Sequence, residues 1–509
     1  MTPRGPVADL VVVGAGLMGA AVAQQVHAAV PQARIVLVDA GAPLGPTPGQ
    51  HLHDTRDQTL RDEHLQRVSP GIQSLYRGAA TSPSLGGSVR GVRPGMYDLA
   101  AFGADARAMP AAAVGWNAGG MGVHWTAATP DPWGSEVFPG TGGDRWDDDL
   151  ATARSLLRVH PDPLGRTAVG ERLLERLTEV FGPASAPGRG PQPMPMAVAP
   201  AGPDRPDGPL ARTGPNVVFP RLAEPSGDDV GIVTGALVTE VLHTAGRVAG
   251  VRLRDVESGW ERDLAARAVV VAADTLRTPQ LLFASGIRPA ALGTHLNEHA
   301  FLTGQVLPDM DRLGIGLEQV PLPRDGEWFV GSYWLPHSGP DQPFHGQVMD
   351  RVFLDEDGGR LAYSVGLSWY VPTEVRPENR LEFDGSTLDA AGLPRTTVRF
   401  SHSARDLELI ELARDSQRRA ATALGPFDPG TGSALLAAGS SLHFTGTARC
   451  GPSDDGTTVC DPDGRVWGFD DLFLAGGAVV PTAVVGNSTL VGMVTAVRAA
   501  RAVVRLLAG

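Results

Sequence analysis

The chain has 509 residues, of which 42% are hydrophobic and 19% charged, as is ordinary for a globular protein long enough for two domains. Its formal net charge of -13 argues against a nucleic-acid partner or an anionic membrane surface. The sequence contains no lysine, so all 43 basic residues are arginines and lysine Schiff-base chemistry is excluded.

Signals for membrane insertion, export and metal binding are missing from the sequence. No apolar run approaches about 20 residues, the length that a membrane-spanning helix needs. The first apolar segment begins near Leu10 and leaves no room for a signal peptide, so we expect a cytoplasmic protein. Two cysteines, Cys450 and Cys460, are too few for a zinc site or a disulfide framework, and we expect free thiols and no bound metal.

The N-terminal segment has the pattern of a nucleotide-binding βαβ unit. Residues 8–13 form an apolar run typical of a buried parallel strand, residues 17–30 predict an alanine-rich helix, and residues 34–39 predict a second strand. Three glycines in G-x-G-x-x-G spacing follow the first strand, namely Gly14, Gly16 and Gly19. Such glycines allow close approach of a pyrophosphate to a helix N-terminus, and an acidic residue, here Asp39, accepts bonds from ribose hydroxyls. The unit predicts dinucleotide binding without distinguishing NAD from FAD.

Segments later in the chain are predicted to add strands and a helix to the same nucleotide-binding domain. Residues 233–253 alternate like a β-meander, residues 268–273 and 471–477 predict buried strands, and residues 489–507 predict a long apolar helix. A nucleotide-binding fold that starts near residue 10 and closes near residue 507 must be built from discontinuous segments. We therefore predict an α/β protein, α+β overall, with a Rossmann-like domain and a second domain over its open edge.

The second domain is expected to contain an antiparallel sheet. Aromatic residues and strand formers cluster in 328–369, and we expect the sheet to continue through 379–383 and 395–400. Residues 406–424 predict a helix. Residues 183–215 are rich in Pro, Gly and Ala with little periodicity, which indicates either a mobile surface loop or a disordered linker.

Predicted domain limits follow from these segments. The nucleotide-binding domain takes residues 1–150, 226–300 and 436–509. The second domain takes residues 151–225, which include the Pro/Gly-rich loop, and residues 301–435.

Four motifs taken together resemble one family. They are the N-terminal glycines, the Gly-Gly-Met-x-x-His-Trp-Thr block at 119–126, the Thr-Pro-Gln-Leu-Leu-Phe-Ala-Ser-Gly block at 278–286, and His443 with the Pro-Thr-Ala-x-x-x-Asn-x-Thr-Leu block at 481–490. The chain resembles the glucose–methanol–choline (GMC) flavoprotein oxidoreductases, and within them it is similar to pyranose oxidases and bacterial glycoside 3-oxidases. The resemblance spans nearly the whole chain and implies FAD as the cofactor.

Some features depart from the fungal pyranose oxidase pattern. One family histidine, in Gly-Thr-His-Arg-Met-Gly, is replaced here by Ala448. The chain is also shorter, without the inserted segments that help the fungal enzymes assemble. This puts a tetramer in doubt, and we expect a monomer or a small homo-oligomer.

The resemblance implies catalytic roles for His443 and Asn487. Neutral His443 would take the hydroxyl proton while the carbinol hydride goes to the flavin, and we expect its pKa in the free imidazole range, about 6 to 7. Asn487 would bond the substrate oxygen; placed before Ser-Thr-Leu, it is also a good cap for the following helix. His299 is given no chemical role.

The resemblance also implies contacts to cofactor and substrate. His124 aligns with a histidine that some pyranose oxidases join covalently to the flavin, a bond that the sequence leaves open. The predicted FAD contacts are Gly14, Gly16, Gly19, Asp39, Gly120, Met121, His124, Trp125, Thr126, Val238, Gly477 and Thr489. The predicted substrate contacts are Gln347, Met349 and Arg351, with Trp369 as a further aromatic candidate.

We therefore expect an FAD-dependent oxidase that converts a secondary ring hydroxyl, at C3 or C2, of a pyranose or a C- or O-glycoside to a keto-sugar and reduces O2 to H2O2. The alternatives are a sugar or alcohol dehydrogenase with a quinone or protein acceptor, a steroid enzyme of the cholesterol oxidase kind, and a flavin-binding protein without alcohol oxidation. The pairing of His443 with Asn487 argues against the last.

Overall fold

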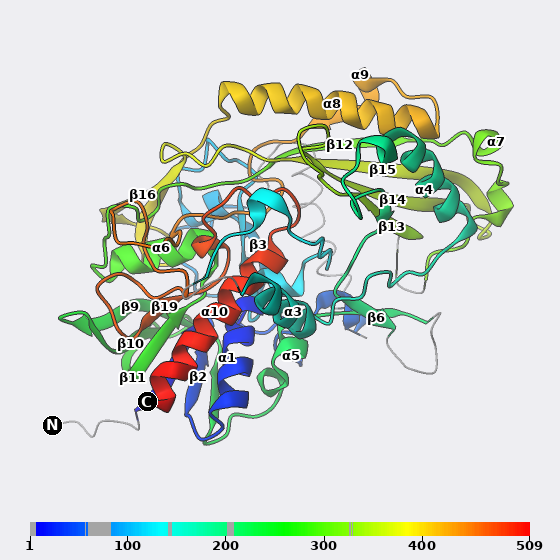
Figure 1. The fold of residues 1–509 in the computed structure, drawn as a ribbon. Helices are drawn as coiled ribbons and strands as arrows, with labels where there is room; N and C mark the ends of the chain where they lie inside the picture. The colour runs from blue at the N-terminus through cyan, green and yellow to red at the C-terminus, as the bar shows by residue number, and fades with distance from the viewer. Residues whose placement is uncertain are drawn as a thin grey trace.

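The computed structural model describes residues 7–55, 57–59, 83–140, 145–200, 208–324, 327 and 329–509. Two large sheets dominate the molecule, one low and one high in the view of Figure 1, and helices lie against both. The first and last elements of the chain, drawn blue and red, lie side by side in the lower body.

The lower sheet has seven strands in the order β8–β2–β1–β11–β10–β9, with β19 beside β11. Their bounds are β1 Ala8–Val13, β2 Ile35–Val38, β8 Val230–Val233, β9 Ala236–Thr244, β10 Arg247–Asp255, β11 Glu261–Val271 and β19 Leu472–Leu474. β1 lies between β2 and β11 in parallel register, and its central residues are fully buried. A strand covered on both faces needs such an unbroken apolar run. The prediction of a Rossmann-like fold assembled from discontinuous segments is confirmed.

Two long-separated helices pack together on this sheet. α1 (Leu17–Ala29) contacts α10 (Thr489–Ala508), and α3 (Trp146–Leu157) packs against α10. α5 (Pro215–Val218) lies on α1, and α6 (Asp274–Ala284) lies on β9. The helix predicted to close the fold therefore begins two residues after Asn487.

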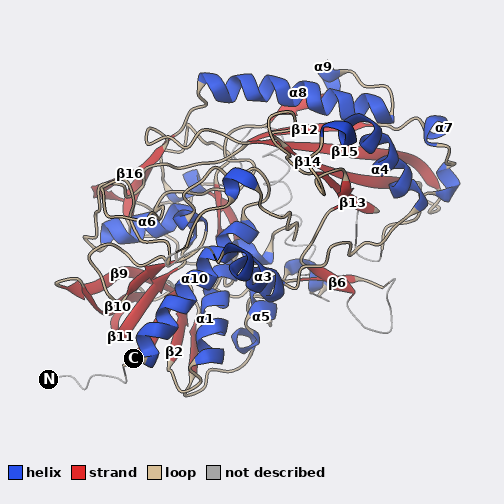
Figure 2. Ribbon diagram, viewed as in Figure 1, coloured by secondary structure: helices blue, strands red, loops and turns tan. Residues whose placement is uncertain are grey.

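The upper sheet is antiparallel, with six strands in the order β18–β12–β15–β14–β13–β5. Their bounds are β5 Gln192–Pro193, β12 Ala300–Val306, β13 Gly331–Leu335, β14 His345–Leu354, β15 Arg360–Val371 and β18 Ser433–Leu435. α4 (Ala168–Phe181) and α8 (Ala404–Leu424) cover its outer face, where they share an apolar cluster with alternate strand residues (Figure 2). α7 (Met310–Leu313) and α9 (Pro429–Gly432) lie at its ends. The inner face is turned toward the lower body.

The expected continuation of the antiparallel sheet is wrong. β16 (Arg380–Leu388) and β17 (Pro394–Arg399) form a separate hairpin. Their inward residues Leu381 and Val398 pack in a different apolar cluster, beside the hairpin of β3 (Gly95–Asp98) and β4 (Ala113–Trp116). Alternation shows that a strand has one buried face, but it does not show which core that face joins. Trp328, at the start of the predicted sheet, lies outside the described residues.

The Pro/Gly-rich segment is more ordered than expected where it is described. It contributes β5 to the upper sheet and forms a small hairpin from β6 (Val198–Pro200) and β7 (Leu210–Arg212). Met194 and Met196 are buried, because each pairs through its backbone with a neighbouring segment. Strands of two or three residues are too short to produce a periodic pattern. Residues 201–207 lie outside the described part, and the exact domain limits stay a prediction.

Other expectations concern membranes and thiols. None of the described helices is long and apolar enough to cross a membrane. Within the described ranges, no group of three His, Cys, Asp or Glu side chains is placed to hold a metal ion. Cys450 and Cys460 are buried free thiols.

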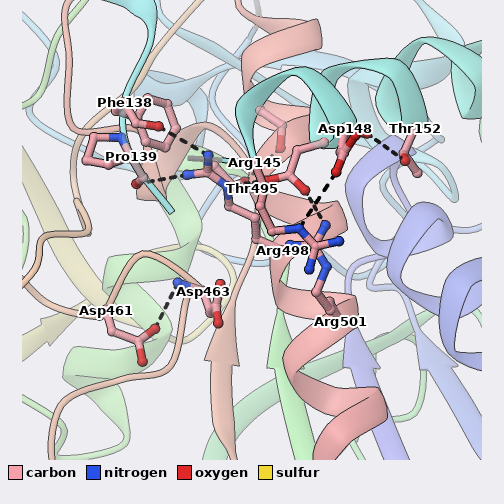
Figure 3. Close-up of polar contacts among 12 residues, drawn as sticks. Phe138, Pro139, Arg145, Asp148, Thr152, Asp461, Asp463, Thr495, Arg498 and Arg501 are labelled. Atoms are coloured by element: carbon pink, nitrogen blue, oxygen red, sulfur yellow. Dashed lines mark hydrogen bonds and ion pairs between the residues drawn. The ribbon is translucent and has the colours of Figure 1, made fainter. Parts of the chain in front are cut away.

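A buried ion pair fixes α10 to α3. Arg498 of α10 and Asp149 of α3 are both shielded from solvent, with Arg498 Nε 2.8 Å from Asp149 Oδ2. Arg501 bonds the other carboxylate oxygen. The guanidinium of Arg498 also donates to the carbonyl oxygens of Phe138 and Pro139, each at 3.1 Å (Figure 3). Both charges thus have further partners, the condition under which a buried pair is tolerated.

Replacement of Asp149 by Ala should leave Arg498 buried without its counter-charge. We expect the free energy of unfolding to fall by about 3–5 kcal/mol, measured by urea denaturation followed by tryptophan fluorescence. Arg172→Ala, which breaks an exposed pair with Glu175, serves as the control and should leave the curve nearly unchanged. Unaltered stability of the Asp149 variant would contradict the importance of the pair.

Candidate active site

The glycine-rich turn between β1 and α1 leaves no room for side chains. Gly14 has a φ of 99°, and a Cβ there would lie 2.4 Å from the Ala272 carbonyl oxygen. A Cβ on Gly19 would lie 1.9 Å from the carbonyl oxygen of Gly14. Gly16 begins α1 without a capping side chain, so the first N–H groups of the helix face a potential anion. This turn has the form that an FAD pyrophosphate requires.

A cavity extends from this turn across the carboxyl ends of the parallel strands. The residues that line it include nine of the predicted cofactor contacts, namely Gly14, Gly16, Asp39, Gly120, Met121, Trp125, Val238, Gly477 and Thr489. The carboxylate of Asp39 accepts hydrogen bonds from the backbone of Ala15 at 3.0 Å and of Gly41 at 2.9 Å. Asp39 therefore shapes the turn itself, besides facing the cavity where a ribose is expected.

Three predicted cofactor residues do not line the cavity. Gly19 does not line the cavity, and its role is to let α1 pack closely against the backbone of Gly14. His124 Nε2 lies 2.8 Å from Asn117 Oδ1, and Thr126 is exposed. Their assignment as flavin contacts stays a prediction, and so does the covalent bond to His124.

His443 and Asn487 do not themselves line this cavity, but residues next to both of them in the sequence do. The neighbours of His443, Leu442 and Phe444, line it, as does Ser488 next to Asn487. His443 Nε2 is 3.3 Å from the Asn487 side-chain nitrogen, and the carbonyl oxygen of that side chain has no partner among the described residues. Segments 44 positions apart in the sequence thus place an imidazole and an amide side by side.

A third side chain, His299, bonds the other nitrogen of His443. His299 Nδ1 lies 3.3 Å from the carbonyl oxygen of Val484, which can only accept, so this nitrogen carries a proton. Burial and the neighbouring histidines hold the pKa of His299 well below its ordinary value, so the ring is neutral and its Nε2 is an acceptor. The His443 Nδ1, 2.8 Å away, must then donate to it. The lone pair of His443 is left on Nε2, beside Asn487.

The turn before His443 is fixed by a buried carboxylate. Glu298 accepts hydrogen bonds from the backbone of Gly439 at 2.6 Å and from the hydroxyl of Ser441 at 2.7 Å. Leu442 has a φ of 58°, a strained conformation for a bulky residue that persists only where its surroundings impose it. Burial raises the pKa of Glu298 to about 7. Sequence reasoning missed Glu298 and gave no role to His299, the residue that follows it in the chain.

The expected titration range of His443 is wrong. Burial lowers the pKa of His443 to about 4, because the charged ring would lose its hydration. The range of 6 to 7 assumed a solvated imidazole. At neutral pH the ring is therefore in its basic form.

The inner face of the upper sheet meets this site at one end. Tyr370 of β15 lies against both His299 and His443, with ring centroids 4.6 and 5.6 Å apart. Its cross-strand partner on β14 is His345, which begins an alternating row along the inner face, continued by Gln347, Met349 and Arg351. Arg351 is about 20 Å along the strand from His345 at 3.3 Å per residue, and its guanidinium lies over Phe353.

Trp369 lies on the opposite face. It packs in the apolar cluster under α8, and its indole N–H donates to Ser416 at 3.0 Å. This placement is against its candidacy as a substrate contact. Alternate residues of a strand point to opposite faces of the sheet. Whether Trp369 and Gln347, on neighbouring strands, share a face can be decided only when the register between the strands is known.

Several buried polar atoms on the inner face have no partner among the described residues. They are the hydroxyl of Ser332, the indole nitrogen of Trp334 and both ring nitrogens of His345. Ser332 and Trp334 pair across the strands with Met349 and Gln347, so they share the inner face. Buried polar groups are ordinarily bonded, and unbonded ones indicate a missing ligand or water.

Comparison with known proteins agrees with this architecture. Two family models, both described as GMC oxidoreductase, match residues 219–301 and 376–496. The chain is 36% identical to a C-glycoside 3-oxidase of Microbacterium trichothecenolyticum, over 97% of this chain and 96% of that protein. The chain belongs to the GMC oxidoreductase family. As a GMC oxidoreductase it is an FAD-dependent enzyme, and the glycine turn and cavity fit that cofactor.

More distant matches include one protein similar in sequence and two solved structures of the same fold. A pyranose 2-oxidase of Tricholoma matsutake is 27% identical over 78% of this chain and 74% of that protein. Formate oxidase of Aspergillus oryzae superimposes with a TM-score of 0.66 at 15% identity, covering 99% of both chains. Pyridoxine 4-oxidase superimposes with a TM-score of 0.64 at 15% identity, over 97% of this chain and 98% of that chain. Among these oxidoreductases the fold alone does not select a substrate.

Substitution of Gly19 by Ala should abolish cofactor binding, because the new methyl group would meet the Gly14 carbonyl at 1.9 Å and displace the turn. We expect FAD content per chain to fall at least about tenfold, which corresponds to about 1.4 kcal/mol, measured by flavin absorbance after gel filtration. Gly190→Ala is the control, since a Cβ there meets no atom within 4 Å. Full FAD occupancy in the Gly19 variant would show that the turn is not the pyrophosphate site.

Proposed function

We propose that the enzyme oxidises a secondary ring hydroxyl of a pyranose or glycoside to a keto-sugar and passes the electrons to O2, forming H2O2. The observation that carries the proposal is the lone pair of His443 Nε2, which faces the Asn487 side-chain N–H at 3.3 Å next to residues that line the FAD cavity. An alcohol loses a proton and a hydride on oxidation, and this site offers a neutral base for the proton.

In the proposed reaction the residues of the chain orient the substrate and move its proton. FAD, when bound, supplies the acceptor for the carbinol hydride. His443 takes the hydroxyl proton on Nε2 while Nδ1–H stays bonded to His299, so the ring cannot rotate as it becomes charged. Asn487 holds the same substrate oxygen through its side-chain amide. The protonated ring then favours negative charge nearby when oxygen is reduced.

The sugar class is supported by the inner face of the upper sheet. A polyhydroxylated ring offers more hydrogen-bonding groups than a steroid to match the atoms of Ser332, Trp334 and His345 that have no partner among the described residues. Gln347 and Met349 follow on the same face and are the predicted contacts that we retain. Arg351 lies too far along β14 to reach the reacting carbon in this proposal. The relative named C-glycoside 3-oxidase favours position C3.

The test is aerobic incubation with glucose and with matched C- and O-glucosides, with H2O2 measured and the keto position assigned by NMR. We expect a 3-keto product and stoichiometric peroxide. His443→Ala should retain FAD and lose at least about 10²-fold in the rate of anaerobic flavin reduction, the contribution of a positioned base. Reduction by sugars without peroxide would favour a dehydrogenase, and a flavin that no sugar reduces would refute the substrate class.

The pH dependence of flavin reduction tests the base directly. His443 is neutral above its pKa of about 4, so its own titration should not lower the rate near neutrality but should lower it as pH drops through about 4. Asn487→Asp places a carboxylate 3–4 Å from the ring, roughly the Asn487–His443 separation, and should raise the pKa and move the midpoint to higher pH. Both profiles are measured by stopped-flow under anaerobic conditions. The pairing of the two residues fails if the variant binds substrate and its midpoint does not move.

A further inference from the structure

The loop that carries Asn487 is attached to a distant segment of the chain through one buried carboxylate. Glu136 ends the short 3-10 helix Gly134–Glu136 and is 2% exposed. Its Oε1 accepts hydrogen bonds from the backbone N–H of Val485 at 2.7 Å and of Gly486 at 3.2 Å. We propose that Glu136 is a positioning residue for Asn487, an inference that rests on the proposed function.

The second oxygen of Glu136 is fixed as well. Oε2 accepts from the backbone of Trp133 at 3.0 Å and lies 3.5 Å from His337 Nε2. His337 is held in turn by Arg189, whose Nη2 lies 3.3 Å from His337 Nδ1. The guanidinium of Arg189 lies between the rings of Trp133 and Trp334, at 5.3 and 5.1 Å from their centroids. The carboxylate therefore cannot turn to other donors, and a buried cation balances its charge.

The same segment is also bonded to the helix that follows Asn487. Arg498 of α10 donates to the carbonyl oxygens of Phe138 and Pro139, two and three residues after Glu136 (Figure 3). Residues 136–139 thus bond the loop just before Asn487 and the helix just after it. This segment therefore connects the loop to α10 through hydrogen bonds on both sides.

The contact leaves the loop little alternative conformation. Gly486 is enclosed on its other side, where a Cβ would lie 3.0 Å from Pro130 and 3.3 Å from His345 Nδ1. The preceding carbonyl of Val484 bonds His299. The two amides held by Glu136 directly precede Asn487, so they set the direction in which its side chain leaves the backbone. A shift of about 1 Å in such a group costs about 10²-fold in rate.

The first test is a double-mutant cycle on the rate of anaerobic flavin reduction. Both oxygens of Glu136 accept from backbone N–H groups. In Glu136→Gln one oxygen becomes an NH2 group, so in either orientation of the amide a donor faces a donor. In the parent we expect a loss of about 10- to 100-fold in that rate at saturating sugar. In the Asn487→Ala background we expect less than about 2-fold further loss, because the group being positioned is already gone. Equal losses in both backgrounds would overturn the proposal.

A matched control separates positioning from general stability. Asp350 is also a buried carboxylate that accepts from a backbone N–H, that of Gly331 at 2.6 Å, but its hydrogen bonds among the described residues stay within the upper sheet, away from the Asn487 loop. Asp350→Asn should lose stability without any coupling to Asn487→Ala. If Glu136→Gln yields no folded protein, Glu136→Asp keeps the charge and shortens the reach, and the same cycle is run with it.

A second measurement does not depend on catalysis. Hydrogen exchange at the Val485 and Gly486 amides, followed by mass spectrometry of a peptide covering the loop, should accelerate in Glu136→Gln and stay unchanged in Asp350→Asn. If exchange is faster in Glu136→Gln but the parent protein oxidises no sugar, the contact between Glu136 and the loop is supported and the proposed function is rejected. Unchanged exchange would reject the positioning role whatever the substrate.

Discussion

The carbonyl oxygen of Val484 begins a hydrogen-bond chain that determines which nitrogen of His443 is basic. It takes the Nδ1 proton of His299, which makes His299 Nε2 an acceptor and fixes the proton of His443 on Nδ1. Because both rings are buried and neutral, the chain has one direction. The fold brings three segments together to define this single lone pair, so the basic nitrogen depends on how those segments pack.

Two buried glutamates hold the backbone around this chain. Glu298 bonds the turn that presents His443, and Glu136 bonds the loop that presents Asn487. In each case a carboxylate takes up backbone N–H groups that irregular structure would leave without partners, which is costly inside a protein. The loops that present His443 and Asn487 thus have backbone N–H groups bonded to buried side chains without forming strands.

Local patterns in the sequence predicted what depends on neighbours along the chain. The βαβ unit, the closing helix after Asn487 and the helix of α8 are periodic over many residues, and they are confirmed. Trp369 shows the limit, since alternation separates two rows of a strand without telling which row meets a helix. Glu136 and His299 act through partners 349 and 144 positions away, and no spacing rule links residues so distant. The proximity of His443 and Asn487 was accessible only because both belong to motifs with a family resemblance.

The interleaved order of the lower sheet has a consequence for how the enzyme is made. β1 pairs with β11, which leaves the ribosome about 250 residues later, and β19 follows another 200 residues on. At roughly 5–20 residues per second, the first strand pairs early with β2 but waits on the order of ten seconds to a minute for its second neighbour, β11. During that interval its apolar run is exposed, as are the glycines that must close the turn. Such long-range pairing also slows folding itself. The lower sheet can therefore be completed only after nearly the whole chain has been synthesised.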